Sequence, residues 1–252
     1  MNVAEHLEGL RSALVDFVRY ADRAGLDAPV PTAPEWTVRQ LLAHQGMVHR
    51  WAAAVVRGER IDPGAIEREG RSAPDPVDWL RDGAIEVVKA ITDAPDDLDV
   101  LIFLKDAPPA KEFWARRQCH ETTMHAVDAL AAVLGRYPKA SETTISTQVA
   151  LDGIDELLTG FITRERSRLR SDVPMTIAVR PTDADRCWSV RVSQEPAVTT
   201  SSPSVVEPVE APDIRLEGTA VQLYLSLWNR SDEVIPEGDW DLWIEGAQIR
   251  WS

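Results

Sequence analysis

A glutamate and a histidine four residues apart, Glu121 and His125, form the pair in this sequence best suited to hold a metal ion. Each residue of an α-helix turns the chain by about 100°, so side chains at i and i+4 can reach one ion together. Asp128 lies three residues beyond His125, and Arg117 lies four residues before Glu121, on the same face. The spacing predicts a metal-binding pair with Asp128 and Arg117 as supporting residues.

The same spacing has a simpler interpretation, in which these charged residues form a solvent-exposed helix face. Arg117 and Glu121 would then be an ordinary intrahelical ion pair. The buried side of the helix would be formed by apolar residues that lie roughly opposite, namely Ala126, Val127, Leu130 and Leu134. An ExxxH pair does not by itself decide between a metal site and a charged surface.

A third metal ligand is expected from one of two histidines in an earlier segment, His44 and His49. Five residues turn a helix about 140° past a full circle, so one straight helix cannot direct both side chains at one ion. Either histidine would complete a site of two histidines and one glutamate. Three protein ligands leave a coordination position open for water or substrate, which is typical of catalytic zinc. The same donor set also accepts nickel, iron or cobalt.

The charge balance argues against nucleic acid and membrane partners. The 252 residues include 27 Lys and Arg against 41 Asp and Glu, a net charge of −14. Such a surface repels phosphate backbones and anionic lipids. Apolar residues make up 44% of the chain and charged residues 27%, which is typical of a folded globular protein rather than a disordered one.

The cellular compartment is indicated by the small number of cysteines and by the character of the first residues. Two cysteines, Cys119 and Cys187, cannot build a disulfide scaffold. The first residues are acidic where a signal peptide needs a basic region and an apolar run. No stretch approaches the roughly 20 apolar residues of a membrane-spanning helix. We expect a cytoplasmic protein, and a monomer, because domains of this size can bury their own cores.

The first part of the chain has helical periodicity, and all five histidines lie in it. Apolar residues recur at helical spacing, and capping signals mark the ends: Thr37 with Gln40, Asp75 before Pro76, and Gly135. The expected helices cover 3–23, 37–58, 76–92, about 110–135 and 144–168. Connections of moderate length between them favour an up-and-down bundle over residues 1–170.

After residue 170 the pattern changes to that of strands. Alternating or β-branched segments predict strands over 175–180, 187–193, 197–202, 213–218 and 242–251. One helix fits between them, over 219–230, and five of the nine tryptophans fall in this part. The fold class expected is therefore α+β, with a helical bundle followed by a small α/β domain over residues 171–252.

Four segments resemble the mycothiol-dependent maleylpyruvate isomerase family. PEWTVRQLLAHQGMVHRWA and RRQCHETTMHAVDA resemble its N-terminal domain, which belongs to the DinB-like group of metal-binding four-helix bundles. GTAVQLYLSLWNR, followed by GDWDLWIEGAQIRW, resembles its second domain, a small α/β unit similar to sterol-carrier proteins. The resemblance covers nearly the whole chain in the same order.

The resemblance implies a set of site residues. The family holds a divalent ion, usually taken as zinc, through the histidine of its LLAH motif and through its ExxxH pair. Here these positions are His44, Glu121 and His125, so the motif favours His44 over His49. The family also directs an arginine of its second domain towards the active site, and Arg230 is the candidate. Its alternative role is that of a cation near a helix C-terminus.

The chemistry implied is that of a small thiol cosubstrate, mycothiol, activated by the metal. The thiolate would add to an electrophilic carbon of a small-molecule substrate. An isomerase would let the bond rotate and then release the thiol, whereas an S-transferase would stop at the adduct. Two other functions fit the same residues: a metal-dependent hydrolase with a metal-bound water, and a non-enzymatic protein that binds a metal or a small ligand. Turnover that requires a thiol would distinguish the first group from the hydrolase.

Overall fold

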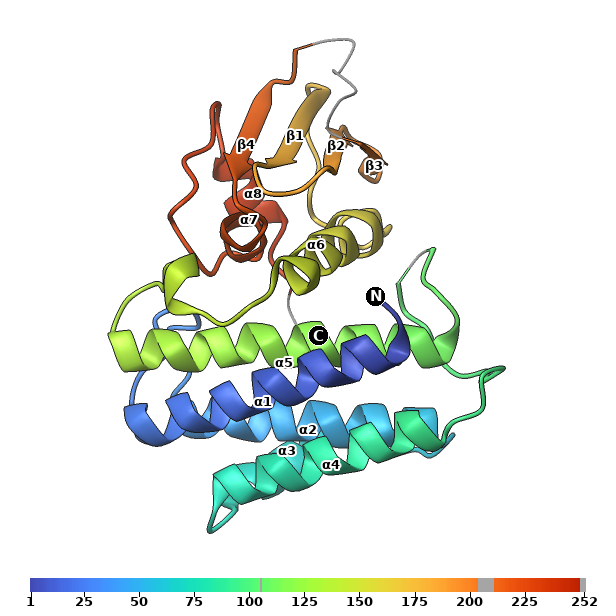
Figure 1. Cartoon of the computed structure of the whole chain (residues 1–252), viewed down its shortest axis with the longest axis vertical. Coiled ribbons are helices and arrows are strands. Elements are labelled where there is room, and N and C mark those ends of the chain that lie inside the picture. The colour runs from blue at the N-terminus through green and yellow to red at the C-terminus, as the bar shows by residue number, and fades with distance from the viewer. Residues whose placement is uncertain (105, 204–210, 250–252) are drawn as a thin grey trace. The chain divides into compact units, whose positions relative to one another are not determined.

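The computed structural model describes residues 1–104, 106–203 and 211–249. The chain forms two compact units, one of helices and one of helices with a sheet (Figure 1). The first unit contains residues 1–102 and 107–138, and the second contains 103–106 and 139–252. The expected α+β fold class is confirmed. The segment 139–170, which we expected to belong with the bundle, groups with the second unit.

Four long helices and one short helix make up the first unit. They are α1 (Val3–Ala24), α2 (Val38–Val56), α3 (Pro63–Ser72), α4 (Pro76–Asp93) and α5 (Ala110–Leu134). The long helices start and end where the sequence signals predict. Thr37 and Gln40 form a capping box, Asp75 caps α4, and Gly135 ends α5 in the left-handed conformation. Helix α3 was missed, although Asp62 before Pro63 repeats the signal that starts α4.

The long helices of this unit pack in pairs, α1 on α5 and α2 on α4, and α2 also packs on α5. A core of apolar side chains holds them together, including Phe17, Leu41, Leu42, Leu80 and Ala129. The contact between α2 and α5 brings together the two helices that carry the candidate metal ligands.

The second unit contains a four-stranded sheet of order β3-β2-β1-β4. Its strands are β1 (Met175–Pro181), β2 (Cys187–Val192), β3 (Val198–Ser202) and β4 (Ile214–Gly218). The pairs β1–β2 and β2–β3 are antiparallel, and β1–β4 is parallel. Four of the five expected strands are therefore confirmed. Helix α7 (Ala220–Leu227) follows β4 and packs on α6 (Thr147–Asp155), which continues as a π-helical turn over Glu156–Phe161.

The fifth expected strand, over residues 242–251, is wrong within the described residues. Helix α8 (Asp241–Gly246) occupies this segment, and residues 250 and 251 lie outside the described part. The Asp239 carboxylate accepts a hydrogen bond from the Asp241 amide and so supports the first turn. Trp240 and Trp243, one helical turn apart, stack at 4.9 Å between ring centroids. This pairing is available at i, i+3 on a helix and not along a strand.

No helix among the described residues combines the length and the apolar character needed to cross a membrane.

The contact between α2 and α4 depends on Gly46, and this gives a first prediction. A Cβ at Gly46 would overlap the ring of Trp79, which already lies 3.9 Å from the Arg50 guanidinium. Because the ring has little room to move, Gly46→Ala is expected to lower the free energy of unfolding by about 1–3 kcal/mol. Chemical denaturation measures this. In a protein that already carries Trp79→Leu, Gly46→Ala should lower the free energy of unfolding by less. An unchanged loss would contradict the overlap of the Cβ with the ring.

Candidate metal centre

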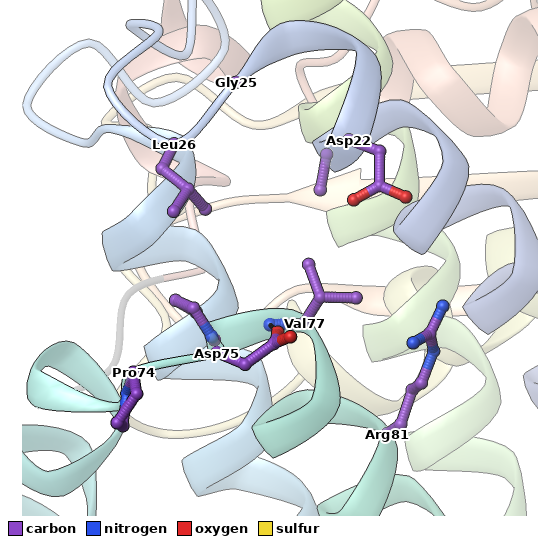
Figure 2. A pocket seen from close by; sticks show the side chains of 9 residues that line it. Asp22, Gly25, Leu26, Pro74, Asp75, Val77 and Arg81 are labelled. Atoms are coloured by element: carbon purple, nitrogen blue, oxygen red, sulfur yellow. Dashed lines mark hydrogen bonds between the residues drawn. The ribbon is translucent and has the colours of Figure 1, made fainter.

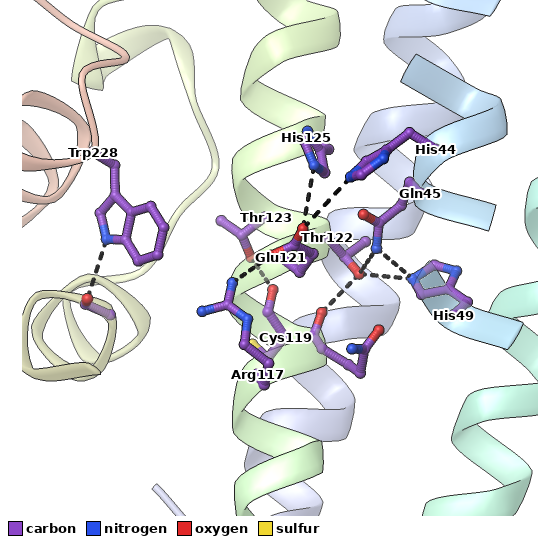
Figure 3. Close-up of polar contacts among 12 residues, drawn as sticks. His44, Gln45, His49, Arg117, Cys119, Glu121, Thr122, Thr123, His125 and Trp228 are labelled. Carbon is purple, nitrogen blue, oxygen red and sulfur yellow. Dashed lines mark hydrogen bonds and ion pairs between the residues drawn. The ribbon is translucent and has the colours of Figure 1, made fainter. Parts of the chain in front are cut away.

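Three candidate ligands from two helices meet in the first unit. His44 comes from α2, and Glu121 and His125 come from α5, one turn apart (Figure 3). One possible ligand atom of each lies within 4.8 Å of those of the other two. Glu121 Oε1 is 3.4 Å from His125 Nε2 and 3.9 Å from His44 Nε2. The alternative of a solvent-exposed charged face is therefore wrong, because Glu121 and His125 face another helix.

Arg117 fixes one oxygen of Glu121 and leaves the other directed at the imidazoles. Its Nη2 donates to Glu121 Oε2 at 2.8 Å, and its side chain is buried. Burial alone would raise the pKa of Glu121, but the Arg117 guanidinium and the histidines His125 and His44 hold it well below the usual value. Glu121 is therefore a carboxylate, and Oε1 is the oxygen that faces the two imidazoles.

His125 is oriented from its other side by Asp128. Its Nδ1 lies 2.8 Å from Asp128 Oδ2, and Asp128 Oδ1 accepts a hydrogen bond from Thr32 Oγ1 at 2.6 Å. This pairing turns His125 Nε2 towards Glu121. Burial lowers the pKa of His125, but Asp128 and Glu121 outweigh it and raise the pKa to about 9. The raised pKa favours an imidazolium whose Nε2 faces Glu121 Oε1 at 3.4 Å.

His44 is the neutral member of the group. Burial lowers its pKa, so the imidazole has a lone pair to offer at neutral pH. The indole ring of Trp36 lies against the His44 imidazole, with ring centroids 4.8 Å apart. The centroid of the Trp36 ring is 6.1 Å from that of His125.

The donor set fits a divalent ion of the zinc type. Ligand bonds of about 2.0–2.1 Å in a tetrahedral site place ligand atoms roughly 3.3 Å apart, close to the separations of Glu121 Oε1 from both imidazoles. A carboxylate, a neutral imidazole and a second imidazole oriented by a carboxylate are the usual surroundings of catalytic zinc. Small movements of His44 would bring the three atoms around one ion.

His49 belongs to a separate buried layer rather than to the ligand group. Its Nε2 lies 2.8 Å from Gln45 Nε2 and 3.0 Å from Thr122 Oγ1, and Thr122 in turn donates to the Gln118 carbonyl (Figure 3). Burial, with a smaller effect of Arg50, lowers the pKa of His49 to about 3, so its imidazole is neutral. This polar layer between α2 and α5 was not expected from the sequence.

Arg230 lies in the second unit, just after α7. Its Nη1 donates to the Trp228 carbonyl at 2.8 Å. Its role with substrate stays a prediction.

A surface cavity of about 460 Å³ lies elsewhere in the first unit, where α1 ends and α4 begins (Figure 2). Its charged lining residues are Asp22, Asp75 and Arg81. Asp75 uses one oxygen to cap α4, and Arg81 pairs with Asp78 at 2.6 Å. None of the three candidate ligands lines this cavity.

Comparison with known proteins identified two family models. The model described as mycothiol maleylpyruvate isomerase N-terminal domain matches residues 7–130, and the MDMPI C-terminal domain matches residues 148–243. The first match contains all three candidate ligands. No curated protein sequence matched the chain.

Two solved structures share the fold. They are crystal structures of the mycothiol-dependent maleylpyruvate isomerase and of a histidine-to-alanine mutant of it. Both are 14% identical to this chain, and each match covers 94% of this chain and 93% of the other. The TM-scores are 0.61 for the isomerase and 0.62 for the mutant.

The raised pKa of His125 predicts a pH-dependent stability of the metal-free protein. The pKa rises from 6.5 to about 9 on folding, so its contribution is complete below pH 6.5 and is lost as the pH rises through 9. The full contribution is about 3 kcal/mol. Denaturant unfolding of chelator-treated protein between pH 6 and 10 measures it. Asp128→Asn should flatten this dependence, and an equally steep dependence in that variant would contradict the assignment.

Proposed function

The chain belongs to the mycothiol maleylpyruvate isomerase family, and from that premise we propose that it is a metal-dependent isomerase that uses mycothiol as its thiol cosubstrate. The observation that supports metal use most directly is the meeting of His44, Glu121 and His125, with ligand atoms within 4.8 Å of one another. The ion is proposed to be zinc. Three ligands would leave a position for the thiol.

The ion would supply one property, a lowered pKa of a thiol bound to it. The protein's own residues prepare the site for this. Arg117 keeps Glu121 ionised and directs one oxygen inwards. Asp128 holds His125 by Nδ1, so that Nε2 is the atom presented. His44 is neutral because it is buried, so no proton competes for its lone pair at neutral pH.

The proposed reaction is a reversible addition to a cis double bond conjugated to a carbonyl, as in maleylpyruvate. The thiolate sulfur forms a bond to one alkene carbon, and the electron pair of the double bond moves onto the carbonyl as an enolate. The former double bond is now single and rotates. Return of the electron pair breaks the carbon–sulfur bond and gives the trans alkene and the thiolate. If the enolate were protonated on carbon instead, the thiol would stay attached as a thioether. The same site could therefore carry out S-transfer.

Calorimetric titration of mycothiol into zinc-loaded protein tests the proposal. We expect stoichiometric zinc and thiol binding that requires the metal. His44→Gln and Glu121→Gln should each lower zinc affinity at least about tenfold, because each removes one of three ligands. His49→Gln is the matched control, since it changes a buried histidine of the same helix outside the ligand group.

Three results would contradict parts of the proposal. Equal loss of zinc in the His44 and His49 variants would contradict the ligand assignment. If zinc-loaded protein does not bind mycothiol but hydrolyses substrates, a hydrolase with a metal-bound water as nucleophile is favoured. If the protein binds no zinc, nickel or cobalt, the proposal of a metal centre is overturned.

Arg230 is proposed to bind the substrate carboxylate. Its guanidinium matches a carboxylate in shape and charge. Arg230→Met is therefore expected to lower kcat/KM at least about tenfold without changing zinc content, with partial recovery in Arg230→Lys. Steady-state kinetics with maleylpyruvate and mycothiol measure this. Unchanged kcat/KM would leave Arg230 as a cation near the end of α7.

A further inference from the structure

The connection between α1 and α2 is an ordered loop. Within it, the Val30 amide donates to the Trp36 carbonyl, and the Trp36 amide donates to the Ala33 carbonyl. At its ends, the Val38 amide donates to the Ala28 carbonyl and Pro29 forms a β-bridge with Thr37. These backbone bonds fix the positions from which residues 32 and 36 project their side chains.

Thr32 uses its hydroxyl on the carboxylate that orients His125. The Thr32 Oγ1 donates to Asp128 Oδ1 at 2.6 Å, and Asp128 Oδ2 lies 2.8 Å from His125 Nδ1. Asp128 is completely buried. A carboxylate held through both oxygens cannot rotate without breaking a charge-assisted hydrogen bond in a site of low dielectric constant. The rotation of the His125 ring is therefore linked to the loop through Asp128.

Trp36 restrains the two imidazoles from another side. Its ring centroid lies 4.8 Å from that of His44 and 6.1 Å from that of His125, and the two imidazoles are 5.2 Å apart and nearly perpendicular. Trp36 is the residue before Thr37, the N-cap of α2, and it also packs on the apolar core. Trp36 therefore directly precedes the N-cap of the helix that carries His44, and it also contacts both imidazole rings.

From these contacts we propose that the loop over residues 25–37 positions both histidine ligands, with Thr32 acting on His125 through Asp128 and Trp36 acting on the two imidazole rings directly. This inference rests on the proposed function, because it concerns how the chain holds its metal. Thr32 and Trp36 are positioning residues, since neither supplies a ligand atom.

Removal of one hydroxyl group tests the role of Thr32. Thr32→Val keeps the shape of the side chain and loses the donor, whereas Thr32→Ser keeps the donor. We expect zinc affinity, measured by competition with a chelator, to fall about tenfold in Thr32→Val and to return to within about twofold of the unmodified protein in Thr32→Ser. The visible absorption of the cobalt-substituted protein should change in Thr32→Val and recover in Thr32→Ser, because it reports ligand geometry.

Trp36→Leu and Trp36→Phe provide a second, independent pair. Leucine keeps apolar contact with the core, and phenylalanine also keeps an aromatic ring against the imidazoles. We expect the cobalt spectrum to change more in Trp36→Leu than in Trp36→Phe, with thermal unfolding of the metal-free variants as the control for packing.

The outcomes separate this inference from the proposed function. If the unmodified protein binds zinc and Thr32→Val binds it equally well with the same cobalt spectrum, the role of Thr32 is overturned and the metal centre stands. If Thr32→Val only lowers the melting temperature, the hydroxyl group serves stability and the inference is equally overturned. If the unmodified protein binds no metal, the proposed function fails and the inference fails with it.

Discussion

The position of the Glu121 carboxylate, which is only 13% exposed, is the constraint on which the rest of the site depends. A carboxylate taken out of water costs several kcal/mol unless charges and hydrogen-bond donors surround it. Arg117 supplies the charge on one oxygen, and His125 and His44 face the other. The need for these partners accounts for two of the buried polar residues of α5, Arg117 and His125. It also explains why α2 must present a histidine at the same level.

The local part of the site could be predicted from the sequence. Glu121, His125 and Asp128 lie on one helix, so the period of the helix places them on one face without any knowledge of the fold. His44 required more, because both histidines of α2 contact α5, and nothing in their spacing tells which of them meets Glu121. The family motif made that choice. Thr32 could not be predicted, because it lies in an irregular loop and its partner Asp128 is 96 positions away in the sequence.

The fold was predictable where capping residues marked the ends of helices, as for α2, α4 and α5, and where periodicity alone was clear, as for α1. It was less predictable in the second unit, where short elements dominate. The segment 242–251 is rich in apolar residues and was predicted to be a strand, yet stacking of the Trp240 and Trp243 indoles at helical spacing favours α8. The expected helix over 144–168 is a short α6 with a π-helical turn, a change of helical type for which the residue pattern holds no signal.

The close approach at Gly46 has a consequence for the metal centre as well as for packing. Gly46 and His44 are two residues apart on α2, so they point about 200° away from each other. The Trp79 ring occupies the concavity at Gly46 on the side of α4, while His44 faces α5 on the opposite side. Because the Trp79 ring fills the space at Gly46, it opposes rotation of α2 about its own axis. The direction of the His44 imidazole is set in part by a tryptophan of α4 that lies outside the ligand group.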